Sequence, residues 1–372
     1  MSPSSLDFLP DLPLTSAIQL LGWQDISRAQ AFAKWLESLS PTHKLQPETV
    51  RAASADASFR RYFRVDTPRA SLIIMDAPPD KENSQPFVAI ASLMQKAGLL
   101  VPQVLAWDPV QGFMLLDDLG QDTMMQVLDV TKPEQNRGLF NRALDALLSL
   151  QQASCPEVLP PYDAAVLQRE LQLFPNWYVG QHRGKTLSAD QAQVLHNSFS
   201  VLVSRNLAAP MVFVHRDFMP RNLMMPWDLN EPRLGVLDFQ DAVYGPITYD
   251  IASLMRDAFI SWEEDFCLDV TVRYWERARA LGMLDHDGWH SDFGAFYRAV
   301  EWMGLQRHLK VAGIFARLGL RDGKPKYLAD TPRFVNYIRA TCSRYRELMP
   351  LLRLIDNIED HNPVSGFAYG RI

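Results

Sequence analysis

Three polar side chains near the middle of the 372-residue chain have types and spacing that could serve phosphoryl transfer. Asp217 follows an apolar run, Asn222 comes five residues later, and Asp238 lies sixteen residues beyond Asn222. Transfer from ATP needs a base or orienting group for the attacking hydroxyl, and oxygen ligands for Mg²⁺. Asp217 suits the first task, and Asn222 and Asp238 suit the second. The pattern predicts a small-molecule kinase that uses ATP and Mg²⁺.

Short apolar segments are expected to position these side chains. Residues 211–214 and 234–237 resemble buried strands, and each run ends at an acidic loop. Residues 223–225 could form the partner strand of a small hairpin. Isolated acids in loops are usually solvated or cap helices, so the hypothesis depends on the whole pattern H-x-D-x-x-x-x-N followed by D-F.

The chain before this motif is predicted to be rich in strands, and the chain around and after it rich in helices. Expected strands are residues 50–53, 62–66, 71–75, 104–107 and 112–116, with helices at 27–39 and 86–98. Long amphipathic helices are expected at residues 133–152, 161–178, 188–208, 249–258, 263–281, 293–318 and 332–351. We therefore expect an α+β protein whose organisation changes near residue 118.

Several segments resemble the aminoglycoside phosphotransferase and choline kinase superfamily. Residues 215–222, 237–241 and 245–252 are similar to its catalytic loop, metal loop and following helix. Residues 56–65, 112–120 and 214–222 resemble, within it, the bacterial kinases that phosphorylate the anomeric hydroxyl of N-acetylmuramate and N-acetylglucosamine in cell-wall (peptidoglycan) recycling. The resemblance implies a two-lobed, protein-kinase-like fold: a small β-rich nucleotide-binding N-lobe (1–118) and a larger helical C-lobe (119–372) for catalysis and substrate binding.

The resemblance also implies roles for individual residues of the motif. Asp217 takes the catalytic-base position, and Asn222 and Asp238 are the Mg²⁺ ligands. His215 braces the catalytic loop. Asp250 bonds the backbone of that loop from beneath, although as the opening residue of a helix it could equally be an N-cap.

The nucleotide-binding residues implied by the resemblance lie earlier in the chain. Ser58, Phe59 and Arg60 occupy the place where kinases fold small residues over phosphates, although the loop contains no glycine. The adenine edge would bond backbone groups near Asp117 and Leu119.

One feature departs from the family pattern, because the third strand carries no lysine or arginine for the phosphates. Residues 71–76 offer Met75 and Asp76 instead. Either nucleotide affinity is weak or another cation replaces the missing one; the candidates are Arg60, Arg61, Arg64 and Lys81. Glu82 could be the partner of that cation or merely an acid favoured by a helix dipole.

Substrate contacts are the least defined part of the sequence. Arg216 and Arg221 flank Asp217 and could offset phosphate charge or meet a substrate carboxylate. Arg221 and Arg307 are the candidates for substrate binding. Two alternatives stay open: another small-alcohol kinase such as an aminoglycoside phosphotransferase, or a pseudokinase that only binds nucleotide or sugar.

Composition limits the possible partners and location. A net charge of −6 and the lack of a long basic run argue against nucleic-acid binding. Three widely separated cysteines form no disulfide framework, and neither a secretory signal nor a membrane-spanning run is visible. The expectation is a cytoplasmic enzyme with a small amino-sugar substrate, no nucleic acid or membrane partner, and no inferred obligate protein partner.

Overall fold

The computed structural model describes residues 16–19, 21–23, 25–55, 59–228 and 230–361, which belong to two compact units. The first unit extends to Gln121 and also contains residues 224–231 and 235–240, whereas the remainder forms the second unit. Residues 235–240 join the first unit through strand β8 (Gly235–Val236), because the Val236 N–H donates to the Leu100 carbonyl at 2.7 Å. The predicted division after residue 118 did not include these later segments.

The first unit is built on an antiparallel five-stranded sheet with the strand order β1-β2-β3-β5-β4. Its strands are β1 (Gln46–Ala55), β2 (Arg61–Asp66), β3 (Ser71–Asp76), β4 (Val104–Asp108) and β5 (Phe113–Asp117). Helix α3 (Gln85–Lys96) joins β3 to β4, and the short α1 (Ser16–Gln19) precedes α2 (Ile26–His43). All five strands overlap the predicted segments.

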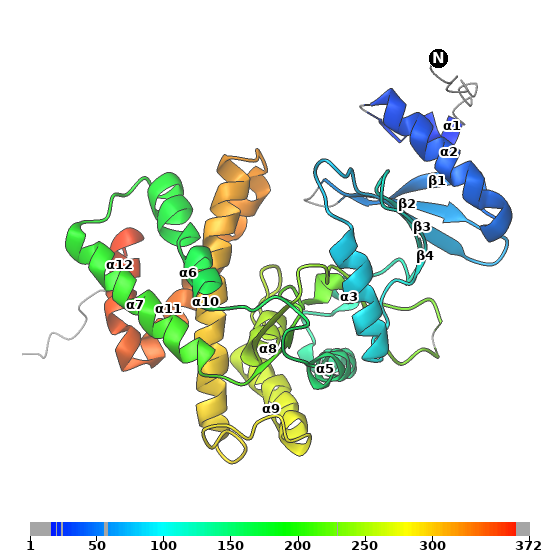
Figure 1. Ribbon diagram of the computed structural model, residues 1–372. Helices are drawn as coiled ribbons and strands as arrows, with labels where there is room; N and C mark the ends of the chain where they lie inside the picture. Colours follow the sequence, from blue (N-terminus) through cyan, green and yellow to red (C-terminus); the bar gives the residue numbers. More distant parts are fainter. Residues whose placement is uncertain (1–15, 20, 24, 56–58, 229, 362–372) are drawn as a thin grey trace, which may run out of the picture. The chain divides into compact units, whose positions relative to one another are not determined.

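Helix α2 covers one face of this sheet (Figure 1). The register pairs Phe63 with Ile74 and Ile74 with Leu115, so these buried side chains share one face. The Phe32 ring of α2 contacts Phe63 at 5.4 Å between ring centroids. The helix begins at Asp25, whose carboxylate accepts the Ser27 N–H at 2.8 Å and so caps the first turn.

The second unit is mainly helical and is organised around α10 (Phe293–Leu320), the long yellow-to-orange helix of Figure 1. Helices α6, α7, α8, α9 and α11 all contact it. The helices of this unit are α4 (Met124–Val127), α5 (Arg137–Gln152), α6 (Ala164–Leu171), α7 (Ala189–Leu207), α8 (Thr248–Met255), α9 (Glu264–Ala280), α10, α11 (Thr331–Arg344) and α12 (Met349–Ile358). Short 3₁₀ segments lie at η1 (Pro133–Asn136), η3 (Pro220–Asn222), η4 (Pro325–Asp330) and η5 (Arg346–Leu348).

Two of the predicted helices are wrong in detail. The segment 161–178 divides into α6 and the π-helix η2 (Phe174–His182), with Pro175 in the first turn of η2. The segment 332–351 divides into α11 and α12, because Tyr345 is extended and Pro350 lies in the first turn of α12. Proline lacks an N–H and disfavours the interior of a helix, whereas the first turn tolerates it.

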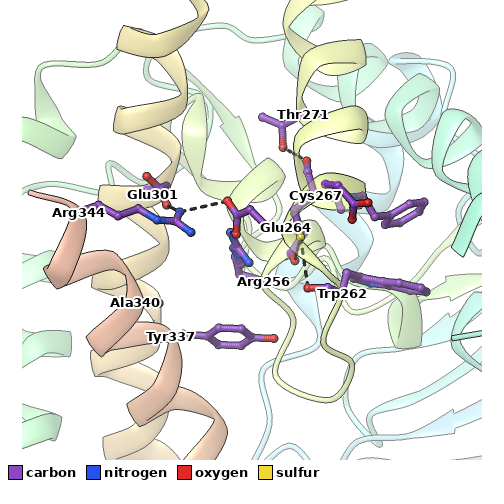
Figure 2. A network of polar contacts seen from close by, with 12 residues as sticks. Arg256, Trp262, Glu264, Cys267, Thr271, Glu301, Tyr337, Ala340 and Arg344 are labelled. Carbon is purple, nitrogen blue, oxygen red and sulfur yellow. Dashed lines mark hydrogen bonds and ion pairs between the residues drawn. The ribbon is translucent and has the colours of Figure 1, made fainter. Parts of the chain in front are cut away.

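A polar network joins four helices of the second unit (Figure 2). Arg344 of α11 bonds Glu301 of α10 and pairs with Glu264 of α9 at 3.1 Å. Glu264 also pairs with Arg256, which follows α8, at 2.6 Å. Burial raises the pKa of Glu264, but hydrogen bonds from Arg344, Tyr297 and Arg256 outweigh it and lower the pKa to about 2. The network therefore cross-links α8, α9 and α11 to α10.

Candidate active site

The predicted catalytic loop follows strand β6 (Met211–Val214), which pairs with β9 (Val243–Pro246). The β9 strand was not predicted. The Asn222 amide nitrogen donates to the Asp217 carbonyl at 2.9 Å and closes the loop into a tight turn. His215 is fully buried, and its Nδ1 accepts the Asp217 N–H at 3.3 Å. Asp217 keeps 42% of its side chain exposed, as a group that meets substrate requires.

Asp250 lies beneath this loop as the resemblance implies. Its two carboxylate oxygens accept the backbone N–H groups of His215 at 2.7 Å and Arg216 at 3.0 Å. Asp250 belongs to the first turn of α8 rather than to its N-cap position, which Ile247 occupies. Burial raises the pKa of Asp250 to about 7, although these two hydrogen bonds favour its ionised form.

Arg216 has a backbone φ of 77°, in the left-handed region that costs a residue with a side chain free energy. Its side chain is held in this position by Glu170 of α6 at 2.6 Å. Glu170 also pairs with Lys310 of α10 at 3.2 Å and accepts a hydrogen bond from the Tyr162 hydroxyl. Neither Glu170 nor Lys310 was singled out in the sequence, because both lie far from the motif along the chain.

Two cations of α10 lie close to the predicted base. The Arg307 guanidinium is 3.8 Å from an Asp217 oxygen and 3.5 Å from the Arg216 carbonyl, and its side chain is only 4% exposed. Burial raises the pKa of Asp217, but Lys310 and Arg307 outweigh that effect and bring the pKa below its ordinary value. Asp217 is therefore ionised at neutral pH.

Asp238 belongs to the first unit, whereas Asp217 and Asn222 belong to the second. Asp238 is exposed, has a φ of 62°, and accepts a hydrogen bond from the Gln240 side chain at 2.8 Å. The next residue, Phe239, is buried against Phe87 of α3 at 4.8 Å between ring centroids. This packing presents the carboxylate outward. That the three groups converge on one ion stays a prediction.

The side chains of Asn222 and Asp238 are the kind of donor that Mg²⁺ prefers. The described residues contain no cluster of three or more His, Cys, Asp or Glu side chains that could hold a metal. One carboxylate and one amide are hard oxygen donors, and Mg²⁺ commonly completes its shell with phosphates and water.

The predicted nucleotide loop is only partly visible, since Ser58 lies outside the described residues. Phe59 is exposed and donates its N–H to Glu82 at 3.3 Å. Arg60 pairs with the same carboxylate group at 3.1 Å. Burial lowers the pKa of Arg60, but Tyr62, Glu82 and Asp238 raise it above its ordinary value.

These contacts narrow the choice of cation that replaces the missing strand lysine. Arg61 pairs with Asp76, and Arg64 pairs with Asp118 at 2.6 Å. Arg60 instead bonds Glu82 and lies within the electrostatic influence of Asp238. Glu82 is the ion-pair partner of Arg60, and that Arg60 binds the phosphates stays a prediction.

The predicted adenine-binding segment begins at Asp117, the last residue of β5. Asp117 is half-buried and accepts the Gln103 N–H at 2.5 Å, and burial raises its pKa. Leu119 is buried. Gly120 has a φ of 143°, and a Cβ there would lie 2.1 Å from the Met225 carbonyl oxygen, so only glycine fits.

Comparison with known proteins decides the family. A model of the phosphotransferase enzyme family matches residues 49–289. The chain belongs to this family. It is 46% identical over 338 residues to an N-acetylmuramate/N-acetylglucosamine kinase of Neisseria meningitidis, covering 90% of this chain and 97% of the relative. A protein of the same name from Pseudomonas aeruginosa is 46% identical over 341 residues, covering 90% and 98%.

Solved structures with the same fold are more distant in sequence. A choline/ethanolamine kinase family protein from Mesorhizobium loti has a TM-score of 0.55 at 17% identity, covering 82% of this phosphotransferase and 92% of that chain. An ADP-bound aminoglycoside phosphotransferase has a TM-score of 0.53 at 14% identity, covering 82% and 97%. The predicted kinase-like α+β fold and the predicted phosphotransferase class are confirmed.

No helix in the described part of this phosphotransferase is long and apolar enough to cross a bilayer.

The predicted substrate-binding residues occupy different surroundings. Arg221 is half-buried, and its guanidinium lies 4.7 Å from the centre of the Phe259 ring. Arg307 lies over the Tyr249 ring at 5.3 Å. Both arginines lower the pKa of Asp257, which burial nevertheless raises to about 6.

Proposed function

We propose that the protein transfers the γ-phosphoryl group of ATP to the anomeric (C1) hydroxyl of N-acetylmuramate or N-acetylglucosamine, as a step of peptidoglycan recycling. The products are the sugar 1-phosphate and ADP. The observation that carries this proposal is the 46% identity, over nine tenths of the chain, to curated relatives named as kinases of these two sugars. The aminoglycoside alternative has less support, because those structures share the fold at only 13–14% identity.

In the proposed reaction the C1 oxygen attacks the γ-phosphorus while the bond to the bridging oxygen of ADP breaks. Asp217 orients the hydroxyl and accepts its proton, which an anomeric hydroxyl releases more readily than an ordinary alcohol. Asn222 and Asp238 would hold Mg²⁺, which neutralises phosphate charge. Arg60 would bind the phosphates in place of the strand lysine, and the backbone near Asp117 and Leu119 would bind adenine.

The test measures ADP release by purified protein with a panel of amino sugars and aminoglycosides, and identifies the product by phosphorus NMR. We expect turnover of the amino sugars to an acid-labile 1-phosphate. Asp217→Ala should lower kcat by about 10²-fold or more while the protein stays folded, because the residue is partly exposed. Absence of amino-sugar turnover would reject the proposed substrate. Unchanged ATP consumption by the variant would reject the role of Asp217.

A further inference from the structure

Three arginines accompany Asp217 in the second unit, and two of them already have partners. Arg216 is held by Glu170 at 2.6 Å. Arg307 is almost completely buried between the Asp217 carboxylate and the Arg216 carbonyl. Both arginines therefore stabilise the catalytic loop. Neither could bind a ligand without giving up the contacts that it already makes.

Arg221 differs from both. It lies in η3 (Pro220–Asn222), next to the residue whose amide closes the loop onto Asp217. Its guanidinium lies over Phe259, and within the described chain it forms no ion pair of 4.0 Å or less. A half-buried guanidinium stacked on an aromatic ring keeps its hydrogen-bond donors at the ring edge, where a planar anion can be bound.

Arg221 acts electrostatically on a buried acid, Asp257, whose pKa it lowers. Asp257 is completely buried, and one of its oxygens accepts the Phe259 N–H at 2.9 Å. This bond fixes the backbone of the residue that carries the stacking ring. Asp257 therefore helps to hold Phe259 under Arg221 without forming an ion pair with the guanidinium.

We propose, on the basis of the proposed function, that Arg221 distinguishes the two sugars by binding the carboxylate of N-acetylmuramate. That carboxylate belongs to the lactyl ether on C3, two ring bonds from the acceptor hydroxyl at C1. N-acetylglucosamine carries a neutral hydroxyl there. A cation beside the base can therefore reach the substituent while C1 faces Asp217. Arg221 binds it through two parallel N–H···O bonds, the geometry in which guanidinium and carboxylate groups pair most strongly.

The experiment measures kcat/KM for both sugars in wild type, Arg221→Met and Arg221→Lys. Methionine keeps the packing on Phe259 but has no charge, and lysine keeps a charge without the planar fork. We expect the ratio of kcat/KM for N-acetylmuramate to that for N-acetylglucosamine to fall about tenfold in Arg221→Met, and less in Arg221→Lys. Arg353→Met, at an exposed arginine of α12, is the matched control and should leave the ratio unchanged.

A second measurement of kcat/KM changes the substrate and uses wild type and Arg221→Met. The methyl ester of N-acetylmuramate lacks the negative charge, so wild type should turn it over less well than the acid, by about the same factor. Arg221→Met should impose no further selective loss on the ester, because the two changes remove the same interaction.

An unchanged ratio in Arg221→Met would overturn the proposal, whether or not both rates fall. If both rates fell together with a raised KM for ATP, Arg221 would bind phosphate instead. Failure of wild type to phosphorylate either sugar would reject the proposed function itself, which is a different outcome.

Discussion

At the scale of single residues, the most consequential contact is the one that Glu170 makes with Arg216. The arginine has a left-handed backbone immediately before Asp217, and Glu170 holds its side chain while Asp250 holds its N–H. A residue one position along the chain from the base cannot move without moving the base. Glu170 is therefore a positioning residue that acts through Arg216.

We predict that Glu170→Gln lowers kcat more than it changes the KM for ATP. The substitution leaves Arg216 and Lys310 without their buried counter-charge, which typically costs about 3–5 kcal/mol of folding free energy. Steady-state kinetics and thermal unfolding check both effects. Glu134→Gln, at an exposed acid of η1, is the control. Wild-type kcat in Glu170→Gln would contradict the positioning role.

Arg60 leads to a prediction about nucleotide binding. Arg60→Gln should raise the KM for ATP if Arg60, whose side chain is 10% exposed and pairs with Glu82, binds the phosphates as proposed. Arg51→Gln is the matched control, since its exposed ion pair with Asp66 belongs to a class worth only about 0–1 kcal/mol. An equal KM for ATP in the two variants would show that another cation binds the phosphates.

At the scale of elements, two glycines of helix α10 differ in how closely a neighbouring element approaches them. Gly313 faces the start of η2, where an added Cβ would lie 2.4 Å from the Leu173 carbonyl carbon. Gly304, nine residues earlier on the same helix, has only the His308 ring within 4 Å of such a Cβ, at 3.8 Å. The two glycines therefore have different reasons to be present.

We predict that Gly313→Ala destabilises the protein by about 1–3 kcal/mol, because the backbone of η2 must shift. Gly304→Ala should be neutral or stabilising by up to about 1 kcal/mol, since alanine is the better helix former. Chemical denaturation of both variants measures the difference. Equal free energies of unfolding for the two variants would show that the backbone of η2 shifts without destabilising the protein.

The sequence predicted elements wherever periodicity or a local motif was strong. The five strands of the first sheet, helix α10 and the catalytic loop after β6 were found in this way. Strand β9 was missed because Val243–Pro246 contains glycine and proline, which are poor strand formers. The division at η2 and the break at Tyr345 were missed because the prediction ran both helices through Pro175 and Pro350, each of which lies in the first turn of a new helix.

The contacts of the candidate site could be predicted from the sequence only where a local motif determines them. Asp217, His215 and Asp250 are bonded as their motif implies, because those contacts are built into the loop and the following helix. Glu170 and Lys310 could not be found, since the pairing depends on how α6 and α10 meet. The ion-pair partners of the three candidate arginines, Glu82, Asp76 and Asp118, also required the structure.

At the scale of the whole molecule, buried ionisable groups determine how stability depends on pH. His308 lies beside the network of Figure 2, at a small cavity of about 20 Å³, and its ring stacks on Tyr337 at 4.7 Å. Burial, and secondarily Arg307, lower its pKa to about 3. Below about pH 6.5 His308 therefore binds fewer protons in the folded protein than in the unfolded chain. Asp250 and Asp257, whose pKa values burial raises to about 7 and about 6, have the opposite effect.

We predict that the free energy of unfolding falls by about 1.4 kcal/mol per pH unit from this histidine as the pH drops below about 6.5. The contribution of Glu264, with a pKa of about 2, is lost only below about pH 4.5. His308→Gln should therefore show a shallower slope between pH 6.5 and 5 in denaturant titrations. His196→Gln, at an exposed position of α7, should keep the wild-type slope.

The carboxylate of Glu170 has one more consequence, for how activity is switched on. In many protein kinases the activation segment becomes ordered only after an added phosphate pairs with arginine. Here the chain supplies its own anion for Arg216, so this arginine needs no added phosphate as its partner. Folding alone should therefore bring the catalytic loop into the arrangement described, without a separate ordering step.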